Sequence, residues 1–90
     1  MSKVYIIRIT DGMNDNYIRA FSTLKKAIQA FAKDCYEDMD YKIDKDLIKQ
    51  LYKLAKTRED EGHDMLLAAD DDGEIWGEDF YETIRVVVLE

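Results

Sequence analysis

The spacing of apolar residues changes along this chain of 90 residues, and that change limits the fold more than any other feature. Lys3–Thr10 and Tyr17–Phe21 are rich in β-branched and aromatic residues, which is typical of strands. The Asp11-Gly12 pair between them favours a turn, so we expect a β-hairpin at the start of the chain. Tyr81–Leu89 has the same character, and its valine-rich end indicates a central strand.

Between these strands the apolar residues recur every three or four positions, which predicts two amphipathic helices. Ser22 is a natural N-cap, and the apolar stripe that follows it predicts a helix over residues 23–37. Asp44 can cap a second helix over residues 45–61, and Gly62 can adopt the left-handed conformation that ends it.

The segment before the last strand predicts a second hairpin. Met65–Ala69 is short and apolar, Asp70–Gly73 has the composition of a loop, and Glu74–Trp76 is the expected return strand. The predicted order of elements is therefore β-β-α-α-β-β-β. We expect a single α+β domain over residues 1–90, with an antiparallel sheet of four or five strands and two helices on one of its faces.

The composition favours a cytoplasmic protein that does not enter membranes. The single cysteine, Cys35, cannot form an internal disulfide, which favours a reducing compartment. The first apolar run is broken by Arg8 and is too short for a signal peptide. No stretch approaches the roughly 20 apolar residues needed to span a bilayer.

Charge is distributed very unevenly. Residues 1–58 carry twelve Lys or Arg and eight Asp or Glu, a net charge of +4, whereas residues 59–90 carry one Arg and twelve acids, a net charge of −11. From Glu59 to Glu82 there is no basic residue except His63. A structural hairpin does not need such self-repulsion, so the acidic third predicts a partner with a basic surface.

Residues for enzyme chemistry are scarce. The only histidine, His63, follows the second helix, and Cys35 lies on the predicted buried stripe of the first helix. One Cys and one His are too few for a usual zinc site, and the four glycines form no phosphate-binding loop. We therefore expect no catalytic residue, no bound metal and no cofactor.

Two weaker motifs keep other functions open. Asp70, Asp72 and Gly73 resemble the middle of a calcium loop, but Ala68 occupies the position of the first ligand. Lys45, Lys49, Lys53 and Lys56 form a basic row on the second helix, which is expected to be a solvated face rather than a contact to nucleic acid.

The candidate docking residues are the acids of the last third together with a lone tryptophan, which would serve as an apolar anchor if it is exposed. They are Asp64, Asp70, Asp71, Asp72, Glu74, Trp76, Glu78, Asp79 and Glu82. The carboxylates could replace phosphates in the nucleic-acid channel of another protein or pair with a basic patch of any kind. A merely soluble surface with no specific partner is the third interpretation.

Part of the chain resembles a loose group of short uncharacterised proteins of bacteriophages and mobile elements. The strand Val4-Tyr5-Ile6-Ile7 and the segment Phe21-Ser22-Thr23-Leu24-Lys25-Lys26-Ala27 carry the resemblance, which covers residues 3–32 and 80–89. In size and charge the chain is also similar to phage inhibitors of host machinery, such as anti-CRISPR and nucleic-acid-mimic proteins. The resemblance implies no catalytic or binding residue.

These observations favour a non-enzymatic, phage-type inhibitor that blocks a basic surface of a host protein in the cytoplasm of the host cell, without contacting nucleic acid directly. The alternatives are an assembly protein that forms homo-oligomers through its sheet or helix faces, and a small-molecule or metal binder that uses Asp70 and Asp72.

Overall fold

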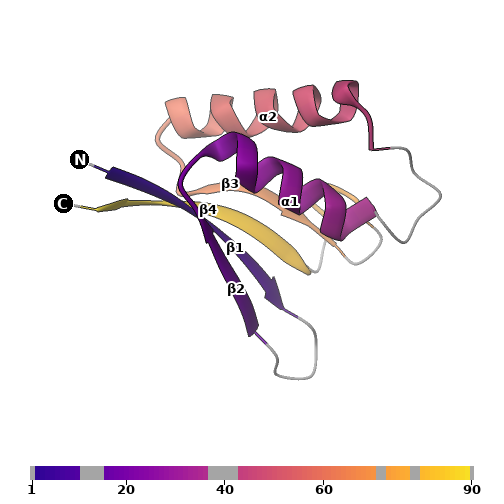
Figure 1. The fold of residues 1–90 in the computed structure, drawn as a ribbon, viewed down its shortest axis with the longest axis horizontal. Coiled ribbons are helices and arrows are strands. Elements are labelled where there is room, and N and C mark those ends of the chain that lie inside the picture. Colours follow the sequence, from indigo (N-terminus) through magenta and orange to yellow (C-terminus); the bar gives the residue numbers. More distant parts are fainter. Residues whose placement is uncertain (1, 11–15, 37–42, 71–72, 78–79, 90) are drawn as a thin grey trace.

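The computed structural model describes residues 2–10, 16–36, 43–70, 73–77 and 80–89. The elements follow the order β-β-α-α-β-β (Figure 1). They are β1 (Ser2–Thr10), β2 (Asn16–Phe21), α1 (Leu24–Tyr36), α2 (Lys45–Asp60), β3 (Met65–Ala69) and β4 (Glu82–Leu89).

The four strands form one antiparallel sheet in the order β2-β1-β4-β3. The two central strands are therefore the first and the last of the chain, and Ser2 pairs with Leu89 so that both ends emerge side by side (Figure 1). The position of β4 inside the sheet confirms the prediction that it is a central strand. The two helices carry the chain from one edge of the sheet, β2, to the other edge, β3.

Both helices lie on the same face of the sheet (Figure 1), so the predicted α+β class with one covered face is confirmed. The pairing of Ile7 with Ile84 places two fully buried side chains on this covered face. Phe31 and Ile28 of α1 are fully buried in the same hydrophobic cluster. Burial of such side chains contributes about 1.5–3 kcal/mol each, so this layer supplies much of the folding free energy.

Neither of the two described helices covers the other face of the sheet (Figure 1). Val4 pairs with Val87 and Ile6 with Arg85, and these residues alternate with the core residues along their strands. On the edge strand β2, the side chain of Ile18 is 61% exposed. This face is therefore a mixture of exposed apolar side chains and arginine.

Local signals set the helix ends. Thr23 rather than Ser22 caps α1, because the Thr23 hydroxyl accepts the Lys26 N–H at 3.2 Å. Asp44 caps α2 as predicted, accepting the Leu47 N–H at 2.9 Å. Gly62 has a φ of 88° at the end of α2, which confirms the predicted left-handed residue.

The predicted return strand at Glu74–Trp76 is not a strand. Ile75 makes only an isolated bridge to Ala69. Within the described ranges the sheet therefore has four strands, and the predicted second hairpin is reduced to this bridge. Trp76 has a φ of 62°, which is not compatible with an extended strand at this position. The turn expected at Asp11-Gly12 lies outside the described residues.

Neither α1 nor α2, the helices in the described ranges, has the length and apolar content required to cross a membrane.

Candidate functional site

The chain leaves β3 through a tight turn that Asp70 organises. The Asp70 carboxylate accepts the Glu74 N–H at 2.9 Å, and the Asp70 carbonyl accepts the Gly73 N–H at 3.0 Å. Gly73 takes a φ of 81°, and a Cβ at Gly77 would collide with the Asp70 side chain. Asp70 therefore acts first on its own chain, by fixing the segment that carries Trp76.

Trp76 has a φ of 62°, and it is the only non-glycine residue with positive φ among those described. A bulky residue in this conformation is a true outlier, because its Cβ lies too close to the backbone, and the cost is about 1–2 kcal/mol. Its N–H nevertheless donates to the Ala68 carbonyl at 2.9 Å, so the strained turn is tied to the edge of the sheet.

The strained backbone directs the indole outward, where 38% of Trp76 is exposed. Phe80, 42% exposed, meets the indole edge to face, with 6.3 Å between the ring centroids. The Arg58 guanidinium of α2 lies 4.5 Å from the centre of the indole. Arg58 Nε also donates to the Met65 carbonyl at 2.9 Å, so the side chain covers part of the open edge of β3.

Two of the predicted acids precede this aromatic pair along the chain. Asp64, before β3, and Glu74, before Trp76, are both exposed. We name the set Arg58, Asp64, Glu74, Trp76 and Phe80 the β3-edge surface. The predicted docking residues Asp71, Asp72, Glu78 and Asp79 lie outside the described residues.

Glu82 does not belong to any surface, and its prediction as a docking residue needs correction. It faces the helices from β4 and is fully buried. Its Oε2 accepts the Cys35 thiol at 3.0 Å, and its Oε1 has no hydrogen-bond donor among the described residues. Burial raises the pKa of Glu82 to about 8, the neighbouring Asp34 carboxylate adds to this effect, and the Cys35 bond opposes it. The sequence could not reveal this, because Glu82 begins a strand whose facing side only the register determines.

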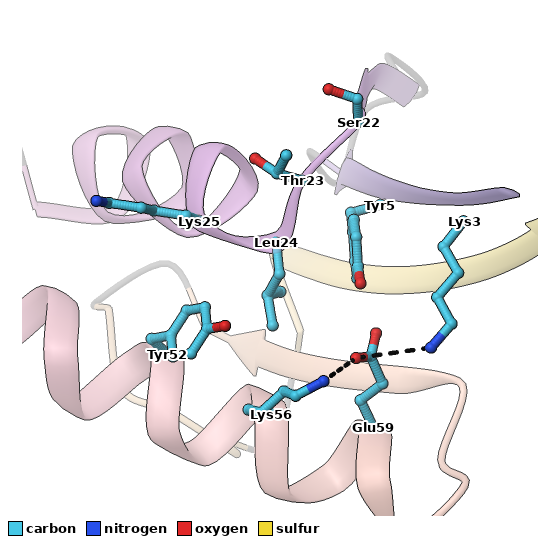
Figure 2. A pocket seen from close by; sticks show the side chains of 9 residues that line it. All are labelled: Lys3, Tyr5, Ser22, Thr23, Leu24, Lys25, Tyr52, Lys56 and Glu59. Carbon is cyan, nitrogen blue, oxygen red and sulfur yellow. Dashed lines mark hydrogen bonds and ion pairs between the residues drawn. The ribbon is translucent and has the colours of Figure 1, made fainter.

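The start of the acidic run is neutralised by lysines. Glu59 Oε1 lies 3.0 Å from Lys56 Nζ and 3.9 Å from Lys3 Nζ, and Asp60 also pairs with Lys56 at 3.5 Å. Among the described residues, acids that are close in the sequence therefore have different surroundings: Asp64 and Glu74 are exposed, Glu82 is in the interior, and Glu59 lines a cavity beside α1 (Figure 2).

The remaining chemical groups have structural surroundings. His63 is exposed beyond α2, with Nε2 3.4 Å from a carboxylate oxygen of Glu61. Burial raises the pKa of the Cys35 thiol, and the Glu82 carboxylate raises it further, so the thiol stays protonated. Within the described part of the chain, no group of three or more His, Cys, Asp or Glu side chains is placed to hold a metal ion.

Arg58 and Phe80 are the members of the β3-edge surface that the sequence does not assign to a site. The flanking Gly73 and Gly77 are a signal that the Trp76 segment turns tightly, but they do not show which residue takes the positive φ. Stacking of Arg58 on Trp76 depends on how α2 packs beside β3, which no local pattern encodes.

Comparisons with protein-family models, with curated proteins and with solved structures find no match to this chain. The function is therefore inferred from the geometry and charge of the sites themselves.

Proposed function

We propose that this protein is a small, non-enzymatic binding protein that docks its β3-edge surface on a basic surface of a protein partner and blocks that surface. The observation that carries the proposal is the outward-facing Trp76 at a positive φ. Glycine would occupy this backbone position without strain, so the tryptophan side chain has to contribute something that offsets the cost.

The environment of Trp76 supports an anchor for a partner. Exposed tryptophan and arginine are the residues that most often dominate protein–protein binding energy. The edge-to-face contact with Phe80 and the stacked Arg58 hold the indole in place, so little side-chain entropy is lost on binding.

Charge supports a basic partner. Asp64 and Glu74 are exposed just before β3 and two residues before Trp76, and the whole chain carries a net charge of −7. Such a surface accelerates association with a cationic partner and repels nucleic acid, which is consistent with a phage-type inhibitor that covers a basic, nucleic-acid-binding groove.

The test is an affinity measurement on the purified pair, once the partner has been identified by cross-linking to the full chain. Trp76→Ala is expected to weaken binding by tenfold or more, as for a central anchor of about 2 kcal/mol. Leu54→Ala is the matched control, because Leu54 is an equally exposed apolar residue on α2. Equal losses for the two variants would overturn the proposal.

The acidic contribution is tested separately. Glu74→Gln is expected to slow association and to reduce its dependence on salt, whereas Asp46→Asn, an exposed acid in the first turn of α2, is expected to leave both unchanged. If Glu74→Gln and the unaltered protein associate at identical rates, the charge of Glu74 does not contribute to binding, and the electrostatic part of the proposal is wrong.

The uncovered face of the sheet is the specific observation that favours homo-oligomers as the second candidate. Ile18 and Val87 are exposed there, and Arg85 on the same face gives the acidic third of a second copy a cationic target. Light scattering at low and high salt tests this: a dimer that dissociates as salt rises is expected, and a monomer under both conditions excludes it.

A further inference from the structure

Two carboxyl groups meet where the end of α1 contacts the start of β4. Glu82 of β4 is fully buried, and the Asp34 side chain in the last turn of α1 is only 26% exposed. One oxygen of each group, Glu82 Oε1 and Asp34 Oδ2, is buried and has no hydrogen-bond donor among the described residues. Buried oxygens without a donor are uncommon in folded proteins, so two of them in one contact require an explanation.

The neighbours of this pair distinguish its two members. The Cys35 thiol donates to Glu82 Oε2 at 3.0 Å, which leaves Oε1 as the unsatisfied oxygen of Glu82. Arg19 Nη1 of β2 lies 3.7 Å from Asp34 Oδ2, close enough for an ion pair but too far for a hydrogen bond. Arg19 and partial exposure therefore favour a negative charge on Asp34, whereas complete burial disfavours one on Glu82.

The strands beside Glu82 supply no donor side chain at this position. Glu82 pairs with Ile9 of β1 and with Ala69 of β3, and both are apolar. Burial is the main cause of the raised pKa of the Cys35 thiol, and the charge of Asp70, just after β3, adds to it, so this side of the cluster is negative as well. The missing donor is therefore best supplied by a proton that the pair itself holds.

A single proton satisfies both oxygens. If Glu82 Oε1 carries the proton, the carboxyl group donates to Asp34 Oδ2, and each oxygen gains a partner. Burial, the hydrogen bond with Asp34 and the Asp34 charge together raise the pKa of Glu82 to about 8, although the Cys35 bond and the Arg19 charge oppose them. A hydrogen bond raises the pKa of an acid when the protonated form is the donor, which agrees with this arrangement.

We propose that Asp34 and Glu82 share one proton, and that this carboxyl–carboxylate hydrogen bond is a pH-sensitive contact that holds the last turn of α1 on the sheet. Arg19 extends the contact to β2, so it joins three elements. The helix dipole places partial negative charge at the end of α1, which further favours the neutral form of the Glu82 carboxyl there.

The contact weakens as pH rises. When the last turn of α1 separates from β4, water reaches Glu82, and its carboxyl regains an ordinary tendency to ionise. Ionisation then stabilises the open state, whereas the closed state keeps its proton up to about pH 8. The open population is therefore expected to increase by up to about tenfold per pH unit until about pH 8 and to level off above it. Opening also exposes the Cys35 thiol, which is partly buried in the closed state.

The shared proton is tested by following the side-chain carboxyl carbon of Glu82 by ¹³C NMR as a function of pH, with Glu82→Gln to assign the signal. The signal is expected to titrate near pH 8. Asp34→Asn is expected to lower the midpoint by about one pH unit or more, because the amide carries no charge and donates to Glu82 Oε1 instead of accepting from it. Asp46→Asn, an exposed acid in the first turn of α2, is the matched control and is expected to leave the midpoint unchanged.

Asp34→Ala keeps this test valid if Asp34→Asn does not fold. It removes the charge and the acceptor, it suits a helix, and it is expected to lower the Glu82 midpoint as well. A midpoint that is the same in the Asp34 variant and in the unaltered protein overturns the shared proton. A Glu82 signal that titrates at the ordinary pKa of a glutamate overturns it too.

Opening of the last turn of α1 is tested through Cys35, the single cysteine of the chain. The rate at which N-ethylmaleimide labels the thiol is compared between the unaltered protein and Glu82→Gln. The glutamine amide donates to Asp34 Oδ2 and its carbonyl accepts from Cys35, so this variant keeps the closed contact at every pH. Labelling of every thiol accelerates with pH, so the ratio of the two rates is the readout.

The ratio of unaltered protein to Glu82→Gln is expected to rise between about pH 5 and about pH 8, by up to about tenfold per pH unit, and then to become constant. A ratio that does not change with pH overturns the pH-sensitive contact. Labelling no faster than global unfolding, as measured by amide exchange in the middle of β1, overturns local opening. None of the residues involved belongs to the β3-edge surface, so these outcomes leave the proposed function unaffected.

Discussion

Trp76 combines two features that rarely occur together, a bulky side chain and a left-handed backbone. The relative stability of a glycine and an alanine variant depends on the backbone conformation at the substituted position. Trp76→Gly is expected to be more stable than Trp76→Ala by about 1–2 kcal/mol, because glycine adopts positive φ without strain.

Urea unfolding of the two variants measures this difference. The same pair of substitutions at the exposed helical residue Lys49 is the control, where alanine is expected to be the more stable by about 1 kcal/mol. If alanine is also the more stable at position 76, the backbone there is not held in the left-handed region, and the main support for the binding proposal is lost.

Glu82 is expected to make stability depend on pH. The pKa in the folded state is about 8, whereas a free glutamate has a pKa of about 4.3. Below pH ~4.3 Glu82 is protonated in both the folded and the unfolded state, so its ionisation does not lower the free energy of unfolding. As pH rises towards 8 the unfolded state ionises first, so the free energy of unfolding falls by about 1.4 kcal/mol per pH unit.

Glu82→Gln is expected to remove this loss, because the amide stays neutral at every pH. The difference in unfolding free energy between the variant and the unaltered protein should therefore grow from pH 5 to pH 8, as measured by urea titration. The groups that face Glu82 are Cys35, Asp34 and, through its ion pair with Asp34, Arg19. Glu74→Gln, an exposed control, is expected to show no such growth; a constant difference for Glu82→Gln would mean that Glu82 is ionised in the fold.

Among the elements, α2 has the most completely specified ends. Asp44 accepts an amide at its start, and at its end Gly62 N–H donates to the Glu59 carbonyl and His63 N–H to the Arg58 carbonyl. This is the double hydrogen bond of a Schellman motif, which requires the left-handed residue that Gly62 supplies.

Gly62→Ala is expected to destabilise the protein by about 1–2 kcal/mol, because alanine is strained at positive φ. Nothing lies within 4 Å of the position a Cβ would take, so the cost comes from the backbone alone. Thermal unfolding measures it. Gly62→Asn serves as the control, because asparagine tolerates this conformation and is expected to cost less. Equal losses would show that the motif does not depend on the left-handed residue.

The stability of the whole sheet depends on the pairing of β1 with β4, its two central strands. β1 and β4 each have a neighbour on both sides, whereas β2 and β3 are edge strands. Amide hydrogen exchange is expected to be slowest in the middle of β1 and β4, where exchange requires global unfolding, and faster in β2, which can open locally. Slower exchange in β2 than in β4 would contradict this topology.

Much of the fold follows from local patterns in the sequence. The apolar stripes locate α1 and α2 to within one residue at each end, Asp44 and Gly62 mark the limits of α2, and the valine-rich run identifies the central β4. These features depend on side-chain spacing and backbone preference within a few residues, which is why a single sequence reveals them.

The sites depend on contacts between distant segments. Glu59 and Glu82 belong to one acidic run, yet packing of α2 beside β3 and α1 places the first near Lys3, and the register of β4 buries the second beside Cys35. A run of like charges in the sequence shows only that its members are close along the chain. Burial and strand pairing decide which of these acids faces a partner, a ligand or the core. They determine whether a carboxylate stays hydrated, pairs with a lysine or becomes protonated.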